Sequence, residues 1–210
     1  MSYSGTRHYS IGAMGDDLRP ILARARTGDL DAFGQLVRSH QRRVYITAYR
    51  MMGNHDEAND VVQDSFLRAL KGIDGFDARS EFFTWLYRIV INVALNHLRG
   101  QRRRGSVPLD QVVLSDALQQ EAGADPRRAL ELKRMTADVA AALDELPDTL
   151  RATVVLVVLE GVAYREAAQI LECSEGTVAW RMHEARQRLH VRLGQYLGGR
   201  RSTASEDNGL

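Results

Sequence analysis

A narrow line of polar side chains runs through an otherwise apolar segment near the middle of the chain. In GFDARSEFFTWLYRIVINVALNHLRGQRRR, residues 75–104, the polar positions Arg88, Asn92, Asn96 and Arg99 recur at intervals of four, four and three. This spacing places them on one face of a helix. Asparagine is a poor helix former, so two on one line need a reason. Amides can pair with base edges and guanidinium groups can hold phosphates, so the row indicates recognition of exposed bases.

A structural role for the same row stays open at this stage, because Asn and Arg side chains can also tie neighbouring helices together. The surroundings favour the nucleic-acid interpretation. Phe83, Trp85 and Tyr87 near the helix start could offer surfaces for an unstacked strand, and the preceding loop from Phe76 to Glu81 could form one wall of a pocket for an extruded base.

A second candidate lies near the C-terminal end, in CSEGTVAWRMHEARQRL, residues 173–189. A short helix ends near Leu171, Glu172-Cys173 forms a tight turn, and Ser174 is placed to cap a new helix, which together predict a helix-turn-helix. In the new helix an apolar stripe is flanked by arginines that could reach phosphates, and the first turn could hold a phosphate oxygen on its free N–H groups. The alternative is a solvated arginine face on an ordinary amphipathic helix. The predicted buried stripe comprises Val178, Met182, Ala185, Leu189 and Leu193, and the flanking arginines are Arg181, Arg186, Arg188 and Arg192.

A third feature is an acidic helix face in HDEANDVVQDSFLRALKG, residues 55–72. An acidic surface beside an exposed leucine does not suit DNA but suits a protein partner with a basic surface. A simple solubilising face is the alternative. The outward positions are Asp56, Asp60, Gln63, Asp64 and Leu67, and the predicted core stripe is Ala58, Val61, Val62, Ser65, Phe66 and Ala69.

Helical periodicity dominates the whole chain, which predicts an all-α fold of two helical domains joined by a flexible linker, the C-terminal one carrying the helix-turn-helix. Glycine- and proline-containing breakers separate the segments. We expect helices at about 17–26, 29–52, 55–71 and 80–101, then at 126–145, 148–160, 163–171 and 174–197. The expected organisation is a flexible lead over 1–15, a first domain over 16–104, a linker over 105–125, a second domain over 126–197 and a flexible tail over 198–210.

Composition and charge restrict the class of protein further. The net charge of +1 conceals an uneven distribution: residues 16–104 carry 15 Lys/Arg against 11 Asp/Glu, whereas 105–150 carry 4 against 9. Local basic blocks therefore permit a polyanionic partner. The sequence shows neither a membrane-length apolar stretch nor a secretory signal, so we expect a cytoplasmic protein with no direct membrane insertion. The single cysteine, Cys173, fits a reducing compartment; with only His183 as a second candidate ligand, a metal site is not predicted and Cys173 is interpreted as a buried structural thiol.

The two segments in this order resemble bacterial RNA polymerase sigma factors of the extracytoplasmic function (ECF) type. The motifs that carry the resemblance are DEANDVVQDSF, FFTWLYRIVINVALNHL, LDELPDTLRATVVLVVLEGVAYREAAQILECSEGTV and ARQRL, and it extends over about residues 17–195. It implies that the first domain, sigma region 2, binds the clamp of core RNA polymerase and captures the melted minus-10 promoter strand. The second domain, sigma region 4, would dock on the polymerase flap and read the minus-35 duplex, and an anti-sigma factor would hold the free protein inactive.

The resemblance also implies roles for individual positions. The acidic helix would contact polymerase through Asp56, Asp60, Gln63, Asp64 and Leu67. The opened minus-10 strand would be held by Asp77, Arg79, Ser80, Thr84, Trp85, Arg88, Asn92, Asn96 and Arg99. The minus-35 duplex would be read by Ser174, Gly176, Thr177, Ala179, Trp180, Arg181, His183 and Arg186.

Four positions of the helix-turn-helix depart from the commonest family pattern. Glu172 stands where many members have a left-handed glycine, Ala179 where Lys or Arg is frequent, Trp180 where Ser is usual and Glu184 where Arg is usual. Two interpretations of Trp180 stay open: packing on a thymine methyl or sugar, or exposure to water. The minus-35 sequence preference is therefore the property least transferable from the family.

The leading hypothesis is a non-enzymatic promoter-specificity subunit, and the alternative is a stand-alone helix-turn-helix regulator that binds duplex DNA as a dimer. A duplex-only regulator has no need for an Asn/Arg row beside an acidic docking helix. An enzyme is not favoured, because no phosphate loop, metal cluster or activated nucleophile stands out and no cofactor is implied. The leading hypothesis fails if the two domains form one core with the polar row packed inside it.

Overall fold

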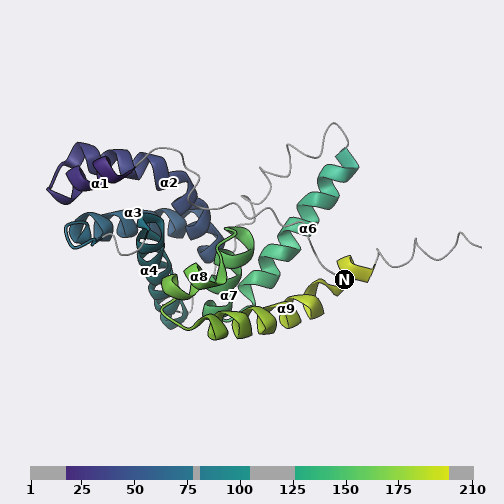
Figure 1. The fold of residues 1–210 in the computed structure, drawn as a ribbon. Coiled ribbons are helices and arrows are strands. Elements are labelled where there is room, and N and C mark those ends of the chain that lie inside the picture. Colours follow the sequence, from purple (N-terminus) through teal and green to yellow (C-terminus); the bar gives the residue numbers. More distant parts are fainter. Residues whose placement is uncertain (1–17, 78–80, 105–125, 199–210) are drawn as a thin grey trace, which may run out of the picture.

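The computed structural model describes residues 18–77, 81–104 and 126–198, and within these ranges the chain forms helices and no strand (Figure 1). The all-α prediction is confirmed, and the predicted helices lie within a few residues of their predicted bounds. The first domain contains α1 (Arg19–Arg26), α2 (Leu30–Met52), α3 (His55–Gly72) and α4 (Phe82–Arg104). The second contains α6 (Pro126–Asp144), α7 (Asp148–Val154), the π-helix η1 (Val155–Leu159), α8 (Tyr164–Ile170) and α9 (Glu175–Gly198).

The helix ends of the first domain are fixed by short polar residues and one glycine. The Asp29 carboxylate accepts the Ala32 N–H at 3.0 Å at the start of α2, and the Asn54 side chain accepts the Glu57 N–H at 2.8 Å at the start of α3. Between them Gly53 adopts φ +79°, which a residue with a Cβ rarely adopts, and this ends α2. The turn lets α3 fold back along α2, as Figure 1 shows.

Helix α4 is the central element of the first domain. Leu86, Val90 and Val93 are fully buried and pack with the core stripe of α3, whose Ala58 and Val61 are also fully buried. The core stripe predicted for α3 is confirmed, since its six members are buried or half-buried. Because α2 and α3, and also α7 and α8 of the second domain, contact α4, little of its surface remains for polar side chains.

The second domain differs from its prediction at one point. A single helix was expected over 148–160, but the helix widens after Val154 into one π turn, and the Glu160 N–H donates to the Val155 carbonyl at 2.9 Å. Gly161 follows with φ +69° and redirects the chain into α8. The apolar run Val154 to Leu159 has no local breaker, so the sequence pattern could not distinguish a π turn from α-helix.

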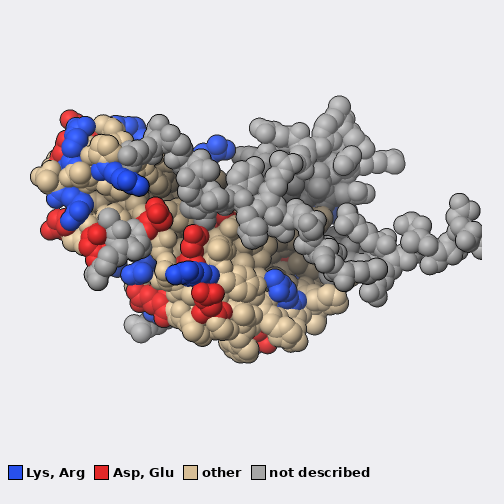
Figure 2. Space-filling model, in the orientation of Figure 1, with Lys and Arg blue, Asp and Glu red and all other residues tan. Residues whose placement is uncertain are grey.

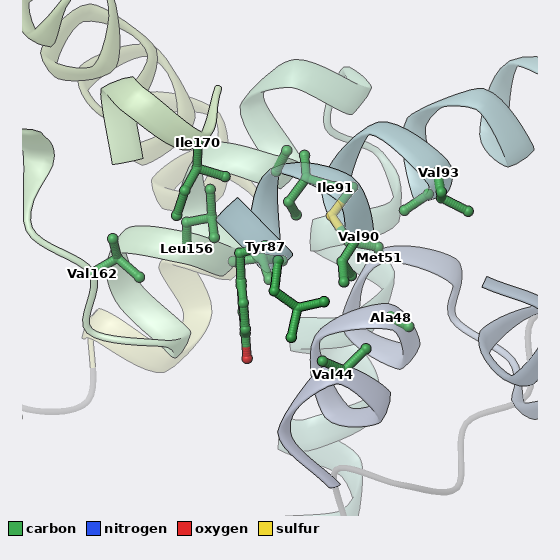
Figure 3. Close-up of a cluster of buried hydrophobic side chains, with 14 of the residues drawn as sticks. Val44, Ala48, Met51, Tyr87, Val90, Ile91, Val93, Leu156, Val162 and Ile170 are labelled. Carbon is green, nitrogen blue, oxygen red and sulfur yellow. The ribbon is translucent and has the colours of Figure 1, made fainter. Parts of the chain in front are cut away.

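The two domains pack directly on one another, which the sequence did not predict. One continuous apolar cluster includes Tyr87 and Ile91 of α4 together with Leu156 of η1 and Ile170 of α8 (Figure 3). In Figure 1, α8 and α7 lie beside α4, while α6 and α9 extend away from the first domain. None of the helices in the described ranges combines the length and the apolar composition that a membrane span requires.

Candidate nucleic-acid and polymerase interfaces

The polar row of α4 lies at the surface. Asn92, Asn96 and Arg99 are exposed, although they lie on a helix whose other positions are mostly buried. Arg99 donates to the Asn96 side-chain oxygen at 3.2 Å, so these two residues form one polar unit. Arg88, at the start of the row, is partly exposed and its Nε lies 3.6 Å from a carboxylate oxygen of Glu172 in the second domain. The row is therefore outside the shared core, and its Asn side chains do not tie helices together.

The aromatic residues beside the row divide into core and surface. Trp85 is half-buried, with its ring centroid 5.3 Å from that of Phe76 and 5.6 Å from that of Phe82, so part of it remains accessible at the surface. Phe83 and Tyr87 are buried and lie 3.9 Å apart between ring centroids. The expectation that these two offer a stacking surface is wrong, because the apolar face of α4 extends further round than the polar row suggested.

The remaining predicted minus-10 residues occupy different environments. Asp77 is exposed in the loop that follows α3, and its neighbour Phe76 is buried. Thr84 is only 3% exposed, so its hydroxyl does not reach the surface in this conformation. Arg79 and Ser80 lie outside the described residues.

The helix-turn-helix has the predicted geometry. Glu172 adopts φ +51°, a left-handed conformation that residues with a Cβ rarely adopt, at the position where the resemblance implied a glycine in many members. The Ser174 hydroxyl accepts the Thr177 N–H at 3.1 Å and caps α9. Val178, Met182 and Ala185 are fully buried against α7 and α8, while Leu189 and Leu193 are half-buried. The predicted stripe is therefore confirmed and fixes which side of α9 faces solvent.

The solvent side of α9 carries the predicted minus-35 residues. Ser174, Gly176, Ala179, His183 and Arg186 are exposed, Thr177 is half-buried, and Trp180 is 61% exposed, a large fraction for an indole. The Gln187 side-chain amide donates a hydrogen bond to His183 Nε2 at 2.9 Å.

The four arginines of α9 are not equivalent. Arg188 pairs with Glu184 at 2.8 Å and Arg192 with Glu145 of the α6–α7 turn at 2.9 Å. Arg181 is half-buried and lies 3.8 Å from the Cys173 sulfur, and Arg186 is exposed. Cys173 is half-buried, not buried as expected, and no group of three or more potential metal ligands occurs in the described ranges.

The outward face of α3 is acidic and polar, with an exposed leucine near its C-terminal end. Asp56, Asp60 and Gln63 are exposed along this face, and Leu67, one turn beyond Gln63, is 48% exposed. Asp64 is half-buried and lies 3.2 Å from His97 Nε2 of α4. Lys/Arg and Asp/Glu side chains are interspersed over the first domain on the face drawn in Figure 2, so local groups, not a single basic patch, determine what each surface binds.

The sequence reasoning missed a buried polar cluster between the domains. Glu160 is 8% exposed and contacts Arg43, Thr47 and Arg50 of α2. Burial, and next the charge of Glu160, raise the pKa of the nearby Tyr87 hydroxyl well above its ordinary value. A lone carboxylate at the end of the apolar run VVLVVLEG was the only signal in the sequence that a buried acid needed partners from elsewhere in the chain.

Comparison with known proteins agrees with this geometry. Sigma-70 region 2 matches residues 36–104 and Sigma-70, region 4 matches residues 136–189. The chain is 34% identical over 182 residues to the ECF RNA polymerase sigma-E factor of Haemophilus influenzae, covering 82% of this chain and 93% of the relative. It is 32% identical over 187 residues to the ECF RNA polymerase sigma factor SigW of Bacillus subtilis, covering 84% and 96%.

Solved structures show the same fold. CnrH in complex with the cytosolic domain of CnrY superposes with a TM-score of 0.62 at 29% identity, covering 86% of this chain and 99% of that one. The sigma factor RpoE in complex with the anti-sigma factor NepR from Bartonella quintana gives a TM-score of 0.60 at 26% identity, covering 77% and 96%.

Two helical domains, one with an exposed amide row and one with a helix-turn-helix, define a promoter-recognition subunit of RNA polymerase. The chain belongs to the ECF RNA polymerase sigma factor family. It is therefore a non-enzymatic subunit that directs core polymerase to promoter DNA, and the stand-alone regulator is not favoured.

Proposed function

We propose that the row Arg88, Asn92, Asn96 and Arg99 on α4 holds the melted minus-10 strand. The observation that carries this proposal is that the two asparagines face solvent from a helix that is otherwise largely buried. An exposed Asn weakens a helix and contributes nothing to the core, whereas its amide can pair with an unstacked base. The half-buried Trp85 at the start of the row supplies an aromatic ring for stacking, and Asp77, Arg79 and Ser80 complete the set, which leaves out the buried Thr84.

The second domain, residues 126–197, reads the minus-35 duplex through α9. We infer that the main-chain N–H of Gly176 holds a phosphate at the exposed first turn, because the Thr177 N–H is already donated to the Ser174 hydroxyl. Arg181 and Arg186 would neutralise neighbouring phosphates. Ala179, Trp180 and His183 read base edges from the same surface. The large exposure of Trp180 favours its contact with a thymine methyl or sugar over simple exposure to water.

The outward face of α3 docks the first domain, residues 16–104, on polymerase. An exposed Leu67 follows Asp56, Asp60 and Gln63 along one face of α3, and this combination of an apolar contact with acidic neighbours fits a basic protein surface. The protein acts in the cytoplasm. Because the structurally similar RpoE is bound to the anti-sigma factor NepR, and CnrH is bound to the cytosolic domain of CnrY, we propose that an anti-sigma factor also holds this chain.

The replacement of both Asn92 and Asn96 by alanine tests the minus-10 proposal. Alanine is a better helix former, so the variant should fold at least as stably as the wild type. We expect core polymerase affinity to change less than twofold while promoter opening on duplex DNA falls about tenfold or more, since each lost base contact costs about 1 kcal/mol or more.

A matched control is Asn59→Ala, which removes an exposed asparagine from α3. Opening is measured by the fluorescence of 2-aminopurine in the minus-10 element, and affinity by titration of labelled core polymerase. Equal loss of affinity and opening would assign the row a structural role instead.

A further inference from the structure

The buried carboxylate of Glu160 connects the two domains. Its side chain is 5% exposed, and its oxygens lie 3.2 Å from Arg43 Nε, 2.8 Å from a terminal nitrogen of Arg50 and 2.9 Å from the Thr47 hydroxyl. Arg43 and Arg50 also donate to the main-chain carbonyls of Glu160 and Leu159, at 3.3 and 3.1 Å. We call these four residues, Glu160, Arg43, Thr47 and Arg50, the Glu160 clasp.

The clasp is built from both sides of the domain boundary. Arg43, Thr47 and Arg50 are spaced at i, i+4 and i+7 on α2, so one face of that helix presents two cations and a hydroxyl. On the other side, the π turn of η1 ends at Glu160 and places its carboxylate at this face. An unpaired carboxylate at this depth would be costly, because it would lose its hydration without gaining partners. Separation of the domains must therefore rehydrate Glu160 and both arginines.

Further contacts cross the same boundary. Arg151 of α7 donates to the Arg50 carbonyl at 3.0 Å, and Arg102 near the end of α4 pairs with Asp148 at 2.6 Å. Arg88 at the start of the polar row faces Glu172, and these two residues border an open cleft of about 540 Å³ between α4 and α8. The contact between Arg88 and Glu172 places the polar row next to the turn from which α9 begins.

This closeness is incompatible with binding both promoter elements at once. Sites centred at minus-10 and minus-35 lie about 25 base pairs apart, which is roughly 85 Å of duplex at about 3.4 Å per base pair. In the packed arrangement Arg88 lies 3.6 Å from Glu172, two residues before the cap of the recognition helix. The 24-residue α9 is only about 36 Å long, so no position along it can lie at the minus-35 element while the polar row of α4 lies at the minus-10 element.

We propose that the Glu160 clasp holds the free protein in a closed, promoter-incompetent conformation, and that its rupture is required for the two domains to occupy their separate DNA sites. The proposal rests on the function proposed above, because it takes α4 and α9 as the two DNA-binding surfaces. Opening exposes Glu160 and its α2 partners to water and frees Arg88 from Glu172. Contacts made with polymerase by each domain then offset the lost interdomain contacts.

The test measures interdomain distance in the full-length protein. Donor and acceptor dyes are attached at Leu30→Cys and Val191→Cys, which are 68% and 85% exposed, in a Cys173→Ser background. The Glu160→Gln variant keeps the shape of the side chain, and we expect its ratio of open to closed molecules to rise at least about tenfold. Arg50→Gln breaks the same contact from the other domain and should open the protein similarly.

The control is Glu145→Gln, which makes the same charge change but breaks only the exposed Arg192 pair within the second domain. It should leave the distance distribution unchanged. Circular dichroism establishes that each variant retains the wild-type helix content. If neither clasp variant populates an open state beyond the control, the clasp does not hold the domains together and the proposal is overturned.

A second measurement tests the link to DNA. Free protein is titrated with a DNA that carries a minus-35 duplex and a pre-melted minus-10 element at native spacing, and with DNAs that carry either element alone. Glu160→Gln should bind the two-element DNA about tenfold more tightly than wild type, with little change on the single elements. Opening without this gain would refute the inhibitory role. Failure of the wild-type holoenzyme to bind either single element would instead refute the proposed function.

Discussion

The replacement of Arg181 and Arg186 by glutamine should reduce the salt dependence of promoter binding by a predictable amount. Each guanidinium that neutralises a phosphate releases condensed counterions and adds about 0.9 to the slope of log K against log salt concentration. Two lost contacts flatten the slope by about 1.8. A rise from about 50 to about 200 mM salt should therefore weaken wild-type binding about 12-fold more than it weakens binding of the double variant.

The assay is fluorescence anisotropy of promoter DNA bound by the holoenzyme across that salt range. The matched control is Arg188→Gln with Arg192→Gln, which removes the same charge from the same helix. Those two guanidinium groups are already paired with Glu184 and Glu145. The control should therefore flatten the slope much less than the Arg181 and Arg186 double variant does. An unchanged slope in the Arg181 and Arg186 variant, or equal flattening in both, would show that the solvent face of α9 does not lie on the phosphates as reasoned.

Two further predictions concern stability. Burial is the main cause that lowers the pKa of His40, so the folded state binds a proton less readily than the unfolded chain. The contribution of His40 to the free energy of unfolding is therefore fully present above about pH 6.5. It falls below that pH by up to about 1.4 kcal/mol per pH unit. Urea unfolding of the wild type and His40→Gln at pH values on either side of about 6.5 checks this, and an equally steep fall in the variant would contradict it. Ser174→Ala removes the cap on the Thr177 N–H and should cost about 1 kcal/mol of unfolding free energy, whereas a loss within error would show that the cap is replaced by water.

Much of the fold could be predicted because local signals agree with one another. Gly53 and Asn54 supply a stop and a start between α2 and α3, and both act in the structure as their chemistry requires. The exposed face of α4 was also predictable, since polar residues that recur with helical spacing on an apolar helix can only face outwards or into a polar cluster. Neither inference needs knowledge of distant contacts.

The packing between domains could not be predicted in the same way. Glu160 is more than a hundred residues from each of its partners on α2, and nothing local distinguishes Arg43 and Arg50 from exposed arginines. Phe83 and Tyr87 were misplaced for a related reason: an aromatic residue near a polar row can stack on a base or complete the core, and only the tertiary arrangement decides which.

The assignment of one DNA element to each domain is tested most directly by site-specific photocrosslinking in the open promoter complex. A photoreactive amino acid is placed at Asn92 on α4 or at Trp180 on α9, and the crosslinked bases are mapped. The account predicts crosslinks from Asn92 to the melted minus-10 strand and from Trp180 to the minus-35 duplex. Crosslinks from Asn92 to polymerase alone, or from Trp180 to the melted strand, would contradict it.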